Sequence, residues 1–274
     1  MLGANLPSAL NDPTSITNDI EKRAGTSQIL RITTLPAKYI ILPLGLAPKP
    51  DGSWRIIHHL SSPSGHSVND YMPQAWGTLT YTRFDDAVAV VQTCGPGAIL
   101  IERDLADASR HIPVHPDDWW LLGFGWMGTW WCDQFLPFGC RTSPAIFDLF
   151  ASALEWILQT QRGWEHMLHY LEDFLAIFPQ FAILSDTLNK YKVDFSQICS
   201  NLGFRVKEEK NEEGHCIKSL GIEIDTEVMD ARLPQDKHQK AMALVNSTLE
   251  HHSVTQKPGN DCGLLVVCPQ SGTR

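Results

Sequence analysis

The sequence has no apolar run long enough to cross a membrane. A spanning helix needs about 20 consecutive apolar residues, and the longest run here, residues 39–47, is interrupted by Pro43. The N-terminus also lacks a basic stretch followed by an apolar one, so we expect no signal peptide. These absences predict an intracellular chain, cytoplasmic or nuclear, with no membrane partner.

Paired cysteines are missing as well. The seven cysteines are scattered without CxxC spacing: Cys94, Cys132, Cys140, Cys199, Cys216, Cys262 and Cys268. An odd number of cysteines in such a pattern is typical of reduced intracellular thiols and does not favour a structural zinc site. The adjacent His58 and His59 do not suggest a metal site either, because neighbouring side chains on a strand point to opposite faces.

Positive charge is scarce. The chain carries 22 Lys and Arg against 31 Asp and Glu, a formal net charge of −9. Proteins that bind phosphate backbones usually present a basic face, so a nucleic-acid partner requires positive charge confined to a cleft, or a basic module outside this chain. With 274 residues, 43% of them hydrophobic, the chain can bury a core as one large domain or two small ones.

Hydropathy patterning predicts mixed strands and helices. Residues 1–36 are polar without a long period, and we expect a poorly ordered lead-in. Three hairpins are expected, over residues 39–60, 121–135 and 167–178, together with strands at 98–101, 204–207 and 217–225. Helical spacing begins at Phe84, at Ser143-Pro144, near residue 184 and after Pro234. An antiparallel sheet with helices on one face, an α+β class, fits this order.

Acidic residues stand at the ends of two predicted strands. Asp104 follows a buried strand, and Glu172-Asp173 lie at the tip of the third hairpin. Neighbouring strands can bring such ends together, and clustered carboxylates persist mainly where a divalent cation neutralises them. Two Mg²⁺ ions about 4 Å apart are a recurring device for in-line phosphoryl transfer. On spacing alone, ordinary turn acids are the commoner explanation.

Five motifs in order resemble those of reverse transcriptases. They read GLAPKPDGSWR (residues 45–55), RDLADASR (103–110), LPFGC with SPAIF (136–147), YLED (170–173) and SLGI (219–222). The wording HHLS (58–61), VHPDDW (114–119) and LP (233–234) is most similar to DIRS-type tyrosine-recombinase retrotransposons. The resemblance covers about residues 43–249. One such tetrapeptide is weak evidence, whereas five motifs in family order are strong evidence.

The resemblance implies a right-hand polymerase fold. An antiparallel palm sheet would be backed by helices, and the thumb would be truncated or absent. The implied division is a lead-in (1–36), fingers (37–97), palm (98–225), the start of a thumb-like helix (226–257) and an irregular tail (258–274). The implied partners are a primed RNA or DNA template and deoxynucleoside triphosphates; the oligomeric state stays open.

The resemblance also implies roles for individual residues. Asp104, Glu172 and Asp173 would hold two Mg²⁺ ions, with Mn²⁺ as an alternative. The remaining roles are contacts with the triphosphate (Arg55, Lys49), a surface beneath the nucleotide and template base (Phe138, Gly139), support of the primer end (Tyr170) and protonation of pyrophosphate (Lys210). Outside the family context, a solvated strand charge is the commoner explanation of Arg55, and a plain turn is the commoner explanation of Phe138-Gly139. A solvated loop charge explains Lys210 at least as well, and a core aromatic explains Tyr170 equally well.

Two positions depart from the family pattern. Glu172 stands where the family has aspartate, and Ser109 stands where it has Phe or Tyr against the sugar C2′. Both predict impaired polymerisation. Three functions therefore stay open: an RNA-directed DNA polymerase domain, a non-catalytic relic that keeps the fold, and another two-metal enzyme such as a nuclease. The triphosphate-binding motif around Trp54-Arg55 argues against the third.

Overall fold

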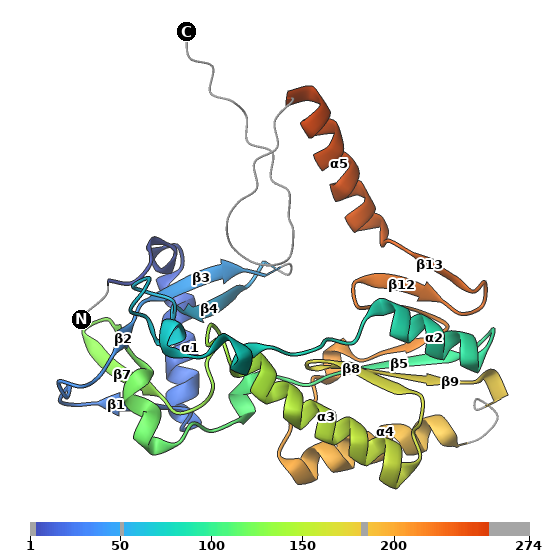
Figure 1. Cartoon of the computed structure of the whole chain (residues 1–274), viewed down its shortest axis with the longest axis horizontal. Coiled ribbons are helices and arrows are strands. Elements are labelled where there is room, and N and C mark those ends of the chain that lie inside the picture. The colour runs from blue at the N-terminus through green and yellow to red at the C-terminus, as the bar shows by residue number, and fades with distance from the viewer. Residues whose placement is uncertain (1–3, 50–51, 182–185, 252–274) are drawn as a thin grey trace.

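The computed structural model describes residues 4–49, 52–181 and 186–251 (Figure 1). Two bodies lie side by side, one built around α1 and β1–β4 and the other around β5, β8 and β9 (Figure 1). No helix in the described ranges is long and apolar enough to cross a membrane. The five cysteines in these ranges are free thiols. The expected tail over residues 258–274 lies outside the described residues.

The N-terminal segment is folded, so the expected poorly ordered lead-in is wrong for its described residues. Helix α1 (Pro13–Gly25) begins at Asp12, whose Oδ1 accepts a hydrogen bond from Ser15 N at 3.0 Å. Ile16 and Ile20, one turn apart, are buried in a cluster with Phe124. The apolar stripe of α1 is short, and the rest of the helix is polar. Packing on the strands that follow therefore stabilises the helix more than its intrinsic helix propensity does.

The first body contains a four-stranded sheet and a separate hairpin. The sheet has the order β1-β7-β6-β2, formed by β1 (Ile29–Ile32), β7 (Thr129–Asp133), β6 (Gly123–Trp126) and β2 (Ile41–Leu42). All its pairs are antiparallel except β2–β6. The hairpin pairs β3 (Leu44–Pro48) with β4 (Trp54–His58), as the first predicted hairpin requires. The predicted turn at Met127-Gly128 joins β6 and β7, with positive φ at both residues.

The second body is built on one antiparallel sheet, which we call the central sheet. Its order is β10-β5-β9-β8, formed by β10 (Glu212–Gly214), β5 (Ile99–Asp104), β9 (Asp173–Phe178) and β8 (Met167–Tyr170). Helices α3 (Ser143–Arg162) and α4 (Thr187–Leu202) cover one face through Phe147, Leu154 and Phe195. Gly163 and Gly203 end these helices in the left-handed conformation that glycine adopts readily. This arrangement confirms the α+β class with a sheet backed by helices.

Helices lie on both faces of the central sheet, not on one. Helix α2 (Phe84–Cys94) packs on the face opposite α3 and α4, against Leu100 and Leu175. The reason is that β5 and β9 are hydrophobic on both sides: Ile101 and Phe174 face α3 and α4. A continuous apolar run of this kind is typical of strands covered on both faces.

The segment after α4 differs from the expected strands. Residues 204–207 form only an isolated bridge, Leu105 to Val206. The strand expected over 217–225 is a hairpin of β11 (Cys216–Ser219) and β12 (Ile222–Asp225) that turns at Leu220-Gly221, and β13 (Asp230–Arg232) extends it. Helix α5 (Gln235–His251) then projects away from the second body (Figure 1).

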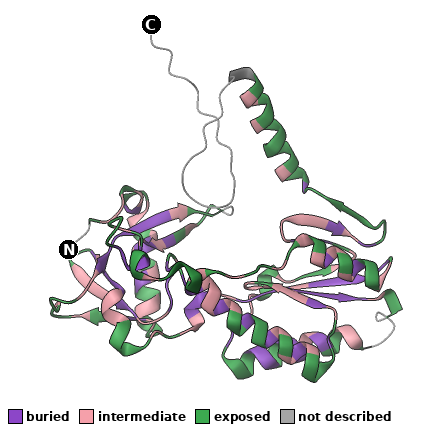
Figure 2. Ribbon diagram, in the orientation of Figure 1, coloured by how far each residue is buried: buried purple, intermediate pink, exposed green. Residues whose placement is uncertain are grey.

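Short 3-10 helices connect the main elements. They span Pro7–Leu10, Val68–Tyr71, Gln74–Gly77, Ala108–His111, Pro116–Leu121 and Glu208–Lys210. Buried residues occupy both bodies and thin out along α5 (Figure 2). Met242, Val245 and Leu249 on α5 are exposed.

Candidate active site

The structure brings the three predicted carboxylate residues to one end of the central sheet. Asp104 at the end of β5 is the direct cross-strand partner of Asp173 at the start of β9. Glu172 belongs to the β8–β9 turn, in which Leu171 has a φ of 52°. The carbonyl oxygen of Glu172 accepts a hydrogen bond from Leu105 N at 2.9 Å. Residues almost seventy positions apart in sequence therefore meet because β5 and β9 are neighbours.

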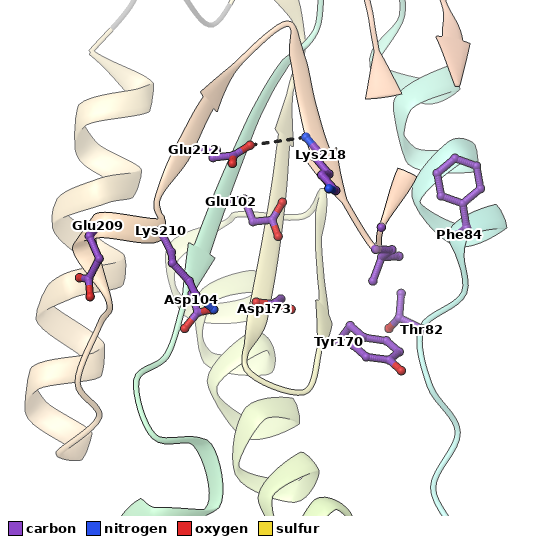
Figure 3. Close-up of a pocket in the computed structure, with 12 residues that line it drawn as sticks. Thr82, Phe84, Glu102, Asp104, Tyr170, Asp173, Glu209, Lys210, Glu212 and Lys218 are labelled. Atoms are coloured by element: carbon purple, nitrogen blue, oxygen red, sulfur yellow. Dashed lines mark hydrogen bonds and ion pairs between the residues drawn. The ribbon is translucent and has the colours of Figure 1, made fainter. Parts of the chain in front are cut away.

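A cavity of about 670 Å³ opens beside this end of the sheet (Figure 3). Asp104 and Asp173 line it, whereas Glu172 does not. The other lining residues come from β5, from the start of α2 and the segment before it, from β8, and from the chain between α4 and β12. They are Thr82, Phe84, Glu102, Tyr170, Glu209, Lys210, Glu212, Lys218, Leu220 and Gly221. Five carboxylates and two lysines surround the cavity. The expected concentration of positive charge is therefore not found in its lining.

Burial and mutual repulsion perturb the carboxyl groups. Burial raises the pKa of Asp173 to about 7, and the negative charges of Glu172 and Asp104 contribute to the rise. Burial also raises the pKa of Glu172, with a further contribution from Asp104, while Lys210 and Arg55 oppose the shift. Carboxyl groups held in this way gain from a nearby cation, since a positive charge favours their ionised forms.

Lys210 neutralises one of these carboxylates. Its Nζ lies 2.5 Å from Asp104 Oδ2, and the hydrogen bond with Asp104 raises the pKa of Lys210. Figure 3 shows Lys210 reaching from the chain after α4 toward Asp104. The sequence allows Lys210 to be either a solvated loop charge or a site residue. The ion pair with Asp104 does not fit a solvated loop charge. The role of Lys210 toward pyrophosphate stays a prediction.

Glu102 is a site residue that the sequence reasoning missed. It precedes Asp104 by two positions on β5, so both side chains lie on the same face of the strand. Burial raises the pKa of Glu102 to about 8, and the charges of Asp173 and Glu212 contribute. Residues two apart on a strand share a face, so the position of Glu102 relative to Asp104 is the sequence signal that indicates it. Lys218 on β11 gave no such signal, because that segment was expected to be a single strand.

Tyr170 lines the cavity on the side opposite Lys210 (Figure 3). Its ring stacks on that of Tyr81 with centroids 5.0 Å apart and an interplanar angle of 27°. The structure therefore places Tyr170 at the site rather than in the core. Tyr81, which precedes α2, is a second residue that the sequence reasoning did not single out.

Arg55 and Phe138 meet at the junction of the two bodies. The Arg55 guanidinium carbon lies over the Phe138 ring, 5.5 Å from the ring centroid. The positive charge of Arg55 opposes the rise in the pKa of Glu172 that burial causes. The expectation that Arg55 faces the carboxylates across a cleft stays a prediction. Lys49 is exposed at the end of β3, and its side chain forms no ion pair within the described ranges.

Of the next two predicted site residues, Ser109 is buried and Gly139 is exposed. Ser109 is 5% exposed, and its hydroxyl donates to Leu136 O at 3.2 Å. Gly139 has a φ of 105°, and a Cβ at this position would collide with the carbonyl oxygen of His58. The glycine is therefore required both by its backbone conformation and by close approach to β4.

The donor set at the cavity suits a hard divalent cation, because Mg²⁺ prefers carboxylate oxygens. Among the described residues, however, no group of three or more His, Cys, Asp or Glu is arranged to hold a metal ion. The ion pair with Lys210 occupies one oxygen of Asp104. The carboxylates are thus gathered without forming a complete coordination shell.

The central part of the chain matches a known protein family. Residues 47–224 match the family model described as reverse transcriptase (RNA-dependent DNA polymerase). The chain belongs to the reverse transcriptase family. This matched span includes β4, the central sheet and the hairpin β11–β12, and hence every residue of the carboxylate cluster.

This reverse transcriptase domain is similar to parts of viral Pro-Pol polyproteins. The protein of simian foamy virus type 1 is 29% identical over 105 residues, which cover 38% of this chain and 8% of the polyprotein. That of simian foamy virus type 3 (strain LK3) is 26% identical over 141 residues, 52% of this chain and 11% of the polyprotein. The domain spans a small part of the relatives' length. The likeness to DIRS-type elements stays a prediction.

The reverse transcriptase domain also shares its fold with solved structures. A foamy viral protease-reverse transcriptase in complex with double-stranded DNA superimposes with a TM-score of 0.67 and 20% identity, covering 88% of this chain and 38% of that chain. The complex of such a protein with an RNA/DNA hybrid gives a TM-score of 0.66, again with 20% identity, over 88% of this chain and 29% of that chain. At this identity, the likeness establishes the fingers-and-palm fold.

Proposed function

We propose that this chain carries the polymerising site of an RNA-directed DNA polymerase. The observation that supports this best is the pairing of Asp104 with Asp173 at the end of the central sheet, beside a 670 Å³ cavity, in a chain of the reverse transcriptase family. The reaction joins the primer 3′-oxygen to the α-phosphorus of a deoxynucleoside triphosphate. The bond to pyrophosphate breaks, and the hydroxyl loses its proton.

Asp104, Asp173 and Glu172 would hold two Mg²⁺ ions, for which Mn²⁺ can substitute. When bound, the ions would activate the 3′-hydroxyl and neutralise charge on the triphosphate. Lys210 would leave Asp104 and donate a proton to the leaving pyrophosphate. Arg55 would contact the triphosphate oxygens through its guanidinium group, which suits bidentate binding of phosphate.

We further propose that the template is a primed RNA or DNA strand. The support is the solved neighbours, which are complexes with double-stranded DNA or with an RNA/DNA hybrid. Residues 37–97 would then act as fingers and 98–225 as palm, with a thumb-like helix from 226. Tyr170 would support the primer end and Phe138 the nucleotide. Glu172 and Ser109 would reduce the rate and the selectivity against ribonucleotides.

A primer-extension assay tests the proposed function. The native chain is mixed with primed RNA and primed DNA, all four deoxynucleoside triphosphates, and Mg²⁺ or Mn²⁺. We expect slow, template-dependent extension that is abolished in Asp104→Asn and retained in Asp118→Asn, a change on the first body in the 3-10 helix Pro116–Leu121. Extension that survives Asp104→Asn would refute the assignment. Binding of the template without extension would favour a non-catalytic relic.

A further inference from the structure

A cluster of charged side chains is buried in the first body, away from the carboxylate cavity. Arg110, Asp133 and His58 are 3%, 0% and 3% exposed. The Arg110 guanidinium pairs with Asp133 Oδ2, and His58 Nε2 lies 3.7 Å from the same oxygen. Asp133 Oδ1 accepts a hydrogen bond from Phe135 N at 3.2 Å. The Asp133 carboxylate therefore contacts the side chains of Arg110 and His58 and the backbone N–H of Phe135.

The cluster has an excess of hydrogen-bond donors. The donors Arg110 Nε, Arg110 Nη2 and Arg23 Nη1 are buried without a hydrogen-bond partner among the described residues. Burial lowers the pKa of His58 well below its ordinary value, and the charges of Arg110 and Arg23 lower it further. His58 is therefore neutral, and Asp133 neutralises Arg110.

Stability does not explain such a pair. Replacing a buried ion pair by apolar side chains of similar volume is often neutral or stabilising, whereas removing one partner strongly destabilises. A chain that keeps Arg110 and Asp133 in its interior therefore gains something other than folding free energy. Buried pairs are retained in some proteins because they fix one geometry among several.

Arg110, Asp133 and His58 belong to three segments that carry the residues proposed to contact the nucleotide. These residues, which we call the nucleotide surface, are Arg55, Ser109, Phe138 and Gly139. Arg110 directly follows Ser109 in the 3-10 helix Ala108–His111. Asp133 ends β7, from which the chain runs through Leu136 to Phe138. His58 ends β4, the strand of Arg55, and its carbonyl oxygen contacts Gly139.

Backbone contacts continue from the cluster to the nucleotide surface. Leu136 N donates to Ile112 O at 3.0 Å, and Val114 N donates to Gln134 O at 2.8 Å. The Ser109 hydroxyl bonds to Leu136 O. A shift at the Arg110–Asp133 pair would therefore move Ser109 and Phe138 relative to each other.

We propose that the buried Arg110–Asp133 pair is a positioning device that fixes the nucleotide surface of this reverse transcriptase domain. The proposal rests on the proposed function. Arg110 and Asp133 touch no reacting atom and act through Ser109, Phe138 and Gly139. The pair determines the affinity for the incoming nucleotide rather than the rate of the chemical step.

The test replaces the pair by apolar side chains of similar size, Arg110→Met with Asp133→Leu. The dissociation constant for a deoxynucleoside triphosphate is measured on the full chain with a primer–template present, separately from the rate of incorporation at saturation. We expect about tenfold weaker affinity, which corresponds to a loss of about 1.4 kcal/mol of binding free energy. The rate at saturation should change by less than about threefold, and the unfolding temperature should not fall.

Two further variants complete the experiment. Arg110→Lys keeps the buried charge and should restore part of the affinity. Arg162→Met, which removes an ion pair to Asp194 between α3 and α4, is the control and should leave the affinity unchanged. A folded double variant with native affinity overturns the inference and leaves the proposed function intact. If the native chain binds no nucleotide at all, both fall. Nucleotide binding without incorporation defeats the proposed function alone, and the affinities of the variants still decide the positioning role.

Discussion

At the residue scale, Glu172 is a predicted metal ligand at which the resemblance implies an aspartate. Its carboxylate is held at the β8–β9 turn but does not line the cavity that Asp104 and Asp173 share. One additional methylene moves a carboxylate by about an ångström, and metal-assisted catalysis is sensitive to displacement on that scale. The longer side chain therefore predicts a slower reaction than an aspartate at this position would support.

We predict that Glu172→Asp raises the rate of primer extension. Restored ligand reach is worth about 3 kcal/mol of transition-state stabilisation, or roughly a hundredfold. The measurement is steady-state extension with Mg²⁺ and with Mn²⁺, beside Glu165→Asp as a control on the loop after α3. A native chain as fast as Glu172→Asp would show that the site tolerates glutamate.

A second residue-scale prediction concerns the contact of Arg55 with Phe138. A cation over an aromatic ring contributes about 0.5–1 kcal/mol at a partly exposed site, and this contact holds Arg55 on the nucleotide side. Phe138→Leu keeps the apolar bulk and removes the ring face, so KM for deoxynucleoside triphosphates should rise roughly threefold with kcat nearly unchanged. Phe150→Leu, exposed on α3, is the control. An equal loss of kcat would contradict a role limited to binding.

At the element scale, a polar contact fixes β8 to α3 beneath the carboxylate turn. His169 on β8 contacts Glu155, and its Nε2 lies 3.4 Å from Asp148 Oδ1; both acids are on α3. Burial alone lowers the pKa of His169, but the hydrogen bond and charge of Glu155, with Asp148, raise it overall above 6.5. The contact orients the strand that carries Tyr170.

This contact predicts a pH-dependent stability. Because the pKa of His169 is higher in the folded state, its contribution is complete below the unfolded value of 6.5 and is lost as pH rises through the folded value. The free energy of unfolding in urea should therefore be lower at about pH 8.5 than at about pH 6, through this group. His169→Gln should remove this part of the pH dependence, and Glu155→Gln should reduce it. A difference that persists in both variants would assign it to other groups.

At the scale of the whole molecule, the N-terminal segment belongs to the fold and to the buried charge cluster. Helix α1 packs on the strands of the first body, and the charge of Arg23 reaches His58 and Arg110. The charged side chains around the carboxylates also come from both bodies. The cavity is rich in carboxylates, and the charge of Arg55, on β4 of the first body, acts on Glu172 outside the cavity lining.

We predict that Ile16→Ala destabilises the chain by about 2–5 kcal/mol, the usual range for truncating a fully buried isoleucine. Leu10→Ala, at a side chain that is 75% exposed, should change the free energy of unfolding by less than about 0.5 kcal/mol. The measurement is chemical denaturation of the whole chain followed by tryptophan fluorescence. Equal stability of the two variants would mean that α1 does not pack on the first body in solution.

The sequence by itself determined the local elements and the order of the motifs. The hairpin of β3 and β4, the turns at Met127-Gly128 and before Glu172, and the helices ended by Gly163 and Gly203 follow from periods and turn residues that a short window contains. The motif order identified the family and the end of the sheet at which the carboxylates meet. These features depend on neighbours in the sequence, and they could be predicted.

Only the tertiary structure decided which distant side chains share a site. Glu212 joins the cavity because β10, which carries it, pairs with β5. Lys210 engages Asp104 rather than solvent, and Arg110 finds Asp133 in the interior. Helix α1 is ordered because strands later in the chain cover its short apolar stripe. The interactions of a charged or amphipathic segment depend on which surfaces the fold places against it, and no local pattern contains that information.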